Sequence, residues 1–294
     1  MSTMVVGDSG GLPFGLLEEL MKQLKVGAKN RGKGVTVDQL RAFLEHRNPF
    51  DLAEISAVLP YADERVESTF GYPEGFIFRT PEEQVLSLLQ IFPALDASKV
   101  PSLVPKIHHE LAEFTPVIPK WQSIAKTYGE ALLLVVAKLK LLHGDKFKNY
   151  REDKLTDEYV RLVEKTRLVY QQLTSNQKGD FLVFDAQFGK RWAGASVRHG
   201  QERYLKEEFG LGPYETGILL LTHPDRVTGN NQLYIECAGI EYRDNPKGLF
   251  SLCLYFRWGG VDQPLELLYR RIDDRYERWG LVSGFRPQCE TGSL

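Results

Sequence analysis

The clearest hydrophobic pattern in the chain lies between Gln232 and Trp258, where two aromatic-rich runs flank the sequence Asn245-Pro246-Lys247-Gly248. Proline presets φ for the first corner of a type I turn, and glycine accepts the positive φ that follows. The sequence therefore predicts a β-hairpin with a three-residue loop. In the second run, apolar side chains occupy every other position over nine residues: Phe250, Leu252, Leu254, Phe256 and Trp258. This alternation predicts that one face of the second strand is buried.

Closing the turn fixes which residues of the two strands lie opposite each other. The expected register places Tyr242 opposite Leu252 and, further from the turn, Ala238 opposite Phe256. A slip of one residue would exchange the faces of the first strand, so only the facing of the second strand is secure.

The opposite face of the hairpin is polar and carries Glu241, Tyr255 and Arg257, with Glu236 at its inner end near Trp258. We interpret this face as a solvated sheet surface, which antiparallel sheets commonly have. The alternative is the floor of a binding pocket, with Glu241 and Arg257 as its polar anchors.

The sequence after the hairpin has a helical pattern. Six apolar residues lie on one stripe of residues 264–279, and Gly280 follows as a terminator: Leu265, Leu268, Tyr269, Ile272, Tyr276 and Trp279. The pattern predicts an amphipathic helix that covers the apolar face of the hairpin. The apolar run 216–222 is too short for its periodicity to distinguish a helix from a buried strand.

The first 174 residues have a mainly helical pattern. The strongest helix start is Thr80-Pro81-Glu82-Glu83, with a capping residue, a proline in the first turn and two acids at the positive end of the helix dipole. We expect helices at 12–26, 37–46, 51–59, 81–92, 103–114, 120–128, 130–142 and 157–173.

These patterns predict an α+β protein in which a mostly α-helical N-terminal part precedes a small antiparallel sheet covered by helices. The predicted division is a flexible start at 1–11, a helical domain at 12–174, a linker at 175–179 and an α+β domain at 180–294.

Composition narrows the class of protein. The 294 residues are 43% hydrophobic and 26% charged, as in soluble globular proteins, and a net charge of −2 argues against a uniformly basic nucleic-acid binder. The longest apolar run, 131–137, is too short to cross a bilayer, and the N-terminus lacks the pattern of a secretory signal. Three cysteines without metal-ligand spacing indicate reduced thiols. We therefore expect a cytoplasmic protein without a membrane partner.

Two segments give a resemblance to known sequences. Residues 40–50 (LRAFLEHRNPF) and 209–242 (FGLGPYETGILLLTHPDRV…LYIECAGIEY) resemble segments of uncharacterised bacterial proteins. The resemblance implies a bacterial, intracellular protein and carries no activity, cofactor or site.

Two basic stretches are candidates for nucleic-acid contacts. Residues 25–33 carry four positive charges and no acid among glycines, but they lack the Gly-Lys-Ser/Thr ending of a phosphate-binding loop. In 138–154, Lys146, Lys148 and Arg151 interleave with Phe147 and Tyr150, which suits phosphate contacts beside stacking surfaces. Nearby acids dilute this charge. We interpret both stretches as solvated segments and keep phosphate contacts as the alternative.

Candidate catalytic residues are few. His223-Pro224-Asp225 ends an apolar segment in a forced turn, and Glu236 follows within the hairpin, so His223, Asp225 and Glu236 are the candidate catalytic residues. His199, in a connection near Asp185, is a second candidate general base. Adjacent His108 and His109 lack the spacing of a zinc helix. We find no serine-nucleophile elbow, no nucleotide fingerprint and no metal-binding cluster, and expect no metal and no cofactor.

The favoured hypothesis is a non-catalytic binding or interaction protein, whose partner is another protein or, through the basic stretches, a nucleic acid. The alternative is a hydrolase or nuclease whose site is assembled from dispersed residues around His223 and Asp225. An enzyme of this kind requires His223, Asp225 and one of Glu236, Glu241 or Arg257 to converge in a pocket.

Overall fold

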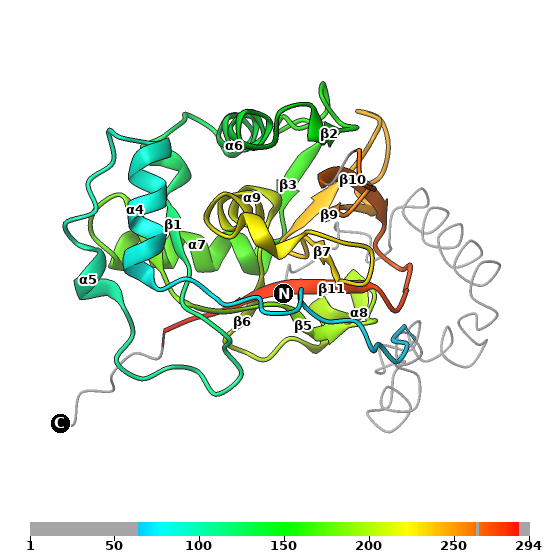
Figure 1. The fold of residues 1–294 in the computed structure, drawn as a ribbon, viewed down its shortest axis with the longest axis horizontal. Coiled ribbons are helices and arrows are strands. Elements are labelled where there is room, and N and C mark those ends of the chain that lie inside the picture. The colour runs from blue at the N-terminus through cyan, green and yellow to red at the C-terminus, as the bar shows by residue number, and fades with distance from the viewer. Residues whose placement is uncertain (1–63, 263–264, 288–294) are drawn as a thin grey trace, which may run out of the picture. The chain divides into compact units, whose positions relative to one another are not determined.

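The computed structural model describes residues 64–262 and 265–287, all within one compact unit, Tyr61–Leu294 (Figure 1). Several predictions fall outside the described residues: the flexible start at 1–11, the helices at 12–26, 37–46 and 51–59, the basic stretch 25–33 and the segment 40–50. In the described part, no helix is long and apolar enough to cross a membrane.

A nine-stranded mixed sheet forms the centre of the fold, so the prediction of a small antiparallel sheet is wrong. Its strands are β2 (Phe147–Asn149), β3 (Val160–Leu162), β5 (Asp185–Ala193), β6 (Glu208–Gly210), β7 (Tyr234–Glu236), β8 (Ile240–Tyr242), β9 (Leu252–Arg257), β10 (Leu265–Arg271) and β11 (Trp279–Phe285). The main order is β2-β10-β9-β7-β11-β5, with β8 joining β3 to β9 and β6 beside β11. The pairs β2/β10 and β7/β11 are parallel. A separate two-stranded sheet pairs β1 (Val117–Pro119) with β4 (Phe181–Val183).

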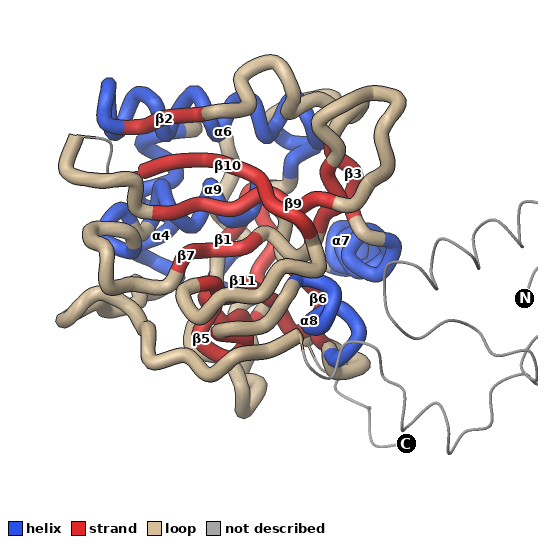
Figure 2. The backbone as a smooth tube through the Cα atoms, turned by 90° about the vertical axis from the view of Figure 1, so that its right-hand side faces the viewer, coloured by secondary structure: helices blue, strands red, loops and turns tan. Residues whose placement is uncertain are grey.

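Six α-helices surround this sheet in the described part of the chain: α4 (Pro81–Ile91), α5 (Val100–Leu103), α6 (Tyr128–His143), α7 (Glu164–Asn176), α8 (Val197–Arg203) and α9 (Pro213–Thr222). Figure 2 shows α6 and α9 behind the large sheet, on the side away from the viewer. Every residue of α9 is buried, which explains why the 216–222 run has no polar stripe to identify it as a helix.

Local signals predicted some helices correctly. Thr80 and Glu83 form a capping box at the start of α4, with Thr80 N donating to Glu83 Oε2 at 2.8 Å, and α6 confirms the helix predicted at 130–142. The helices predicted at 103–114 and 120–128 are wrong. Pro105, Pro116 and Pro119 interrupt this region, which contains α5, β1 and a short 3-10 turn. The segment 157–173 divides into β3 and α7.

The hairpin forms, although not throughout its predicted length. Gly248 N donates to Asn245 O at 2.8 Å and Tyr242 pairs with Leu252, as expected. Gly248 does not take the positive φ that we predicted. The first strand breaks at residues 237–239, where Gly239 N donates to Leu211 O at 2.8 Å, so Ile235 rather than Ala238 lies opposite Phe256. Beyond this break β8 pairs with β3 along all three of its residues and keeps one pairing with β9, Tyr242 with Leu252.

The helix predicted at 264–279 is wrong. Residues 265–271 form β10, antiparallel to β9, with Leu267 opposite Phe256, and Trp279 begins β11. Glu266 and Arg270 lie off the apolar stripe of the predicted helix, but both are buried. Glu266 pairs with Arg257 on the neighbouring strand β9, and Arg270 pairs across β9 with Glu236 of β7. Because these buried positions carry charged residues, the apolar residues of the segment recur with the period of a helix instead of the period of two that a strand usually shows.

The large sheet has two unlike faces. The inner face, toward α6 and α9, carries fully buried apolar residues such as Ile235, Leu254 and Phe256. The outer face, toward the viewer in Figure 2, carries Tyr255 and Arg257. Tyr255 is only 7% exposed, so the interpretation of this face as simply solvated is wrong at its centre.

Residues on either side of 175–179 share one hydrophobic core. Helix α6 packs against α9, and β2 and β3 belong to the large sheet. Gln177 is buried, and its side chain accepts from Val183 N at 2.8 Å and donates to Val183 O at 2.6 Å. A domain boundary at this position stays a prediction, which proteolysis can test.

Candidate binding face

Strand register brings polar and aromatic side chains into rows on the outer face of the sheet. Lys148 of β2 pairs with Glu266 of β10, and Glu266 pairs with Arg257 of β9. On the other side of β9, Tyr234 of β7 pairs with Trp279 of β11. Paired residues on neighbouring strands have their side chains on the same face. These five residues therefore cross the outer face from β2 to β11.

The aromatic members of this face form a continuous cluster. The ring centroids of Tyr234 and Tyr255 lie 6.4 Å apart at an interplanar angle of 22°, and those of Tyr255 and Trp279 lie 6.0 Å apart. Tyr276, in the turn before β11, lies 5.5 Å from Trp279 and is 47% exposed. Tyr234 and Trp279 are half-buried. Part of the aromatic surface is thus open to solvent while its centre is packed.

A buried ion pair lies beneath these rings. Glu236 of β7 is fully buried and accepts a hydrogen bond from Arg270 Nε of β10. The Arg270 guanidinium also donates to Asp274 O and lies 3.5 Å from the centre of the Trp279 ring. Burial raises the pKa of Glu236, and the Arg270 guanidinium opposes that shift. The pair therefore fixes the position of the Trp279 ring from below.

Three buried polar atoms around this ion pair have no hydrogen-bond partner among the described residues: Glu236 Oε2, Arg270 Nη2 and Trp279 Nε1. They comprise one acceptor and two donors. A buried polar group without a partner costs about 1–3 kcal/mol, so native proteins rarely leave one unless water or a ligand completes it. These atoms mark the polar centre of the outer face.

Two carboxylates of the face, Glu266 and Glu236, are neutralised by arginines. Arg257 Nε donates to Glu266 Oε2 at 2.8 Å, and Glu236 is held by Arg270. Glu266 Oε1 also accepts from Tyr150 Oη at 3.3 Å. Among the described residues, exposed Lys148 has no carboxylate partner, and its Nζ lies 5.7 Å from the centre of the Tyr150 ring. The charge that remains unpaired on this face is positive.

Four of the residues predicted from sequence come together on this face: Tyr255, Arg257, Glu236 and Lys148. Glu241 is bound elsewhere, because Arg161 of β3 donates to it at 2.6 Å. Lys146 is exposed in the 3-10 turn before β2. Arg151 lies 4.4 Å from the ring of Tyr269, whose pairing with Leu254 places it on the inner face. The basic stretch thus divides between the two faces.

His223 belongs to the inner core. Its Nε2 accepts from Arg79 N at 3.0 Å, and its Nδ1 lies 3.2 Å from Leu219 O, to which it donates in the tautomer that this arrangement requires. Its ring lies among four aromatic rings: Phe76, Phe78, Phe114 and Phe188. Burial lowers the pKa of His223 to about 4. His223 is therefore a neutral core side chain at neutral pH.

The three candidate catalytic residues do not form a common hydrogen-bonded group in the described structure. Asp225 is exposed, His223 is fully buried at the end of α9 toward the inner face, and Glu236 is on the outer face. The convergence that a hydrolase or nuclease site at His223 requires is not supported by these positions.

Asp185 binds a different histidine from the one expected. His108 Nδ1 lies 2.9 Å from Asp185 Oδ1, and Asp185 Oδ2 accepts from His109 N at 2.6 Å. His199 instead lies near the ring of Trp192, with centroids 6.2 Å apart. A carboxylate on an imidazole can orient a general base. Here the same carboxylate also accepts from Thr115 Oγ1 at 3.0 Å, so it anchors the preceding loop to β5.

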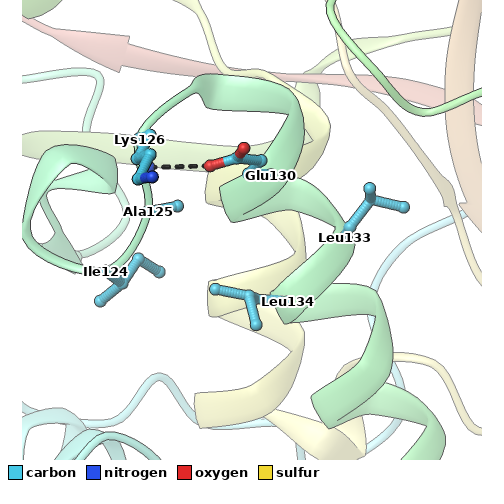
Figure 3. Close-up of a pocket in the computed structure, with 6 residues that line it drawn as sticks. All are labelled: Ile124, Ala125, Lys126, Glu130, Leu133 and Leu134. Atoms are coloured by element: carbon cyan, nitrogen blue, oxygen red, sulfur yellow. Dashed lines mark hydrogen bonds between the residues drawn. The ribbon is translucent and has the colours of Figure 1, made fainter.

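A shallow groove lies away from the outer face, between the 3-10 turn Trp121–Ser123 and α6 (Figure 3). Lys126 N donates to Glu130 Oε2 at 3.0 Å at one end of it. The lining is mainly apolar: Ile124, Ala125, Lys126, Glu130, Leu133 and Leu134. In the described part of the chain, no group of three or more histidine, cysteine, aspartate or glutamate residues could hold a metal ion.

Sequence reasoning does not identify Tyr234 and Trp279, which complete the aromatic cluster. It places Trp279 on the apolar stripe of the helix predicted at 264–279. Residues 279–285 (WGLVSGF) have no alternation of apolar and polar side chains that would have identified the exposed side of a strand. Comparisons with protein-family models, curated proteins and solved structures found no match, so the face is interpreted from its own geometry.

Proposed function

We propose that the chain is a non-catalytic binding protein that recognises its ligand with the outer face of the large sheet. The observation that carries this proposal is the contiguous cluster of Tyr234, Tyr255, Trp279 and Tyr276, which is partly open to solvent. Aromatic side chains offer a large, rigid contact area at a low cost in conformational entropy.

The arginine–glutamate pairs around the aromatic cluster favour binding rather than catalysis. Glu236 and Glu266, two carboxylates of the face, are engaged by arginines and so are poorly placed to act as a general base. The Trp279 ring, packed against the Arg270 guanidinium, is already in position for a ligand, which lowers the ordering cost of association.

The indole N–H signals of the four tryptophans test this proposal by NMR. The protein is titrated separately with a single-stranded oligonucleotide, a neutral glucose oligosaccharide and an acidic peptide. At least one probe is expected to shift the Trp279 signal, identified with the Trp279→Phe variant, and to be recovered intact. Trp121, in a 3-10 turn beside the groove of Figure 3, is the internal control.

Two results would overturn the proposal. If every probe leaves the Trp279 signal unchanged, the outer face is not a binding surface for these ligands. If a probe binds and is cleaved, the protein is not a non-catalytic binder.

A further inference from the structure

We infer that the ligand of the outer face is a single-stranded nucleic acid, an inference that rests on the binding function proposed above. The face combines partly exposed aromatic rings with an unpaired positive charge at its β2 edge. Proteins that bind single strands use this combination, because rings stack on bases while cations contact the backbone phosphates.

The charge distribution favours an anionic ligand. Arg257 and Arg270 balance Glu266 and Glu236, which leaves Lys148 as the uncompensated charge of the strand rows. Lys146, exposed just before β2, adds a second cation at the same edge. The turn between β10 and β11 carries three acids and two arginines: Asp273, Asp274, Glu277, Arg275 and Arg278. Arg271 of β10 binds Asp273 at 2.7 Å, so the formal charges of the other four cancel. A local positive edge is compatible with the net charge of −2 of the whole chain.

The aromatic side chains extend across the sheet. Tyr150, 42% exposed, lies at the end of β2 beside Lys148, and its backbone N continues the sheet by donating to Leu267 O at 3.1 Å. At the other side, Trp279 and Tyr276 lie on and before β11. The four strand spacings from β2 to β11 correspond to about 19 Å. This width suits a short site of about four nucleotides.

Neutral sugars fit the face less well. Aromatic platforms can stack on sugars as well as bases, but a neutral sugar makes no use of the positive charge of Lys148 and Lys146 at the β2 edge. A double-stranded ligand presents its bases already stacked, so it cannot use the rings.

The test measures the fluorescence anisotropy of a labelled oligothymidylate of about 15 nucleotides with the full chain. We expect binding that weakens as salt rises. Lys148→Ala is expected to lower the slope of log affinity against log salt by about 0.7, the value for one phosphate contact in a single strand. Lys178→Ala, at an exposed lysine between α7 and β4, is the matched control and should leave the slope unchanged.

Stacking is tested at Tyr150, whose side chain is 42% exposed, with the thermal unfolding of each variant measured alongside. Tyr150→Leu should weaken oligothymidylate binding at least about fivefold, since a base–aromatic stack contributes about 1–3 kcal/mol. Tyr150→Phe retains the ring and should bind nearly as well as the original protein. Trp279→Leu should weaken binding similarly, with its thermal unfolding measured alongside.

The outcomes separate the two proposals. Binding of heparin or duplex DNA as tight as that of oligothymidylate, without an effect of Tyr150→Leu, would show attraction by charge alone and overturn the inference. If only the oligosaccharide or the peptide shifts the Trp279 signal, the binding function stands and the nucleic-acid inference fails. If no probe binds, both fail.

Discussion

Arg270 and Glu236 form a buried ion pair that spans β9, since Arg270 belongs to β10 and Glu236 to β7, the two neighbours of β9. Cys253 of β9 lies between them, with its Sγ 3.9 Å from Glu236 Oε1. The pair links three strands on the outer face and holds the Trp279 ring. Because the charged Arg270 is buried by this pair, the sequence of β10 has a helical rather than a strand-like pattern. Loss of the pair should lower the free energy of unfolding.

Removing one partner of this pair should destabilise the fold strongly. Arg270→Met leaves the Glu236 carboxylate buried without its cation, which typically costs about 3–5 kcal/mol. The double variant Arg270→Met/Glu236→Leu should recover much of that loss, because no charge remains buried. Urea unfolding of the two single variants and the double variant measures the coupling. A double variant as unstable as the sum of the singles would show that the two residues act independently.

Truncating a side chain on either face of β9 should destabilise the fold. Phe256→Ala on the inner face should cost about 3–5 kcal/mol, because the residue is fully buried. Tyr255→Ala should cost about 2 kcal/mol or more, since its ring packs against Tyr234 and Trp279. Tyr276→Ala, at a ring that is 47% exposed, is the control and should change stability by about 0.5 kcal/mol. A loss at Tyr255 as small as at Tyr276 would mean that the outer face is open to solvent.

The sequence correctly predicted those elements that depend on residues adjacent in the chain. The cap and proline of α4 and the turn between β8 and β9 need only neighbouring residues. Alternation along β9 also placed Tyr255 and Arg257 correctly on one face.

The rest of the sheet depends on contacts between distant residues. Glu266 and Arg270 are buried only because Arg257 and Glu236 neutralise them, and no pattern within 264–279 reveals those partners. Strand β3 pairs with β8 across about 80 residues, and no signal within its three residues distinguishes it from the helix predicted at 157–173. The sequence therefore predicted only part of the candidate face. Tyr234 and Trp279 were not predicted, because their strands are held by pairing with residues that are distant in the sequence.

The segment 175–179 should resist cleavage if its contacts persist in solution. Gln177 ties the end of α7 to β4 through both hydrogen bonds to Val183. Limited proteolysis of the folded chain should therefore produce no pair of fragments divided at this segment. Gln177→Ala removes the two bonds and should raise the rate of cleavage there. Rapid release of two stable fragments from the unmodified protein would instead support the predicted domain boundary.

His223 should make stability fall in mild acid. Its folded-state pKa of about 4 is below the usual 6.5, so the unfolded chain binds the proton first as pH falls. The free energy of unfolding should decline from about pH 6.5 toward pH 4, by up to about 3 kcal/mol from this group. Unfolding measured across this range should show a shallower decline for His223→Gln. Equal slopes for the two proteins would contradict the assignment.

Glu215 should have the opposite dependence at higher pH. Its buried carboxyl accepts from Tyr128 Oη at 2.8 Å and from Gly212 N at 3.1 Å at the start of α9. Burial raises the pKa of Glu215 from 4.5 to about 7, so the folded protein holds the proton more tightly than the unfolded chain. Stability should therefore fall as pH rises from about 4.5 to 7 and level off above that range.

Glu215→Gln tests this dependence because the amide keeps an acceptor for both bonds and cannot ionise. The variant should lack the loss of stability that the carboxyl causes between pH 4.5 and 7. Chemical unfolding of the two proteins at several pH values gives the difference directly. A difference that does not change with pH would mean that Glu215 ionises in the folded protein as readily as in the unfolded chain, and that the helix start stabilises the charged form.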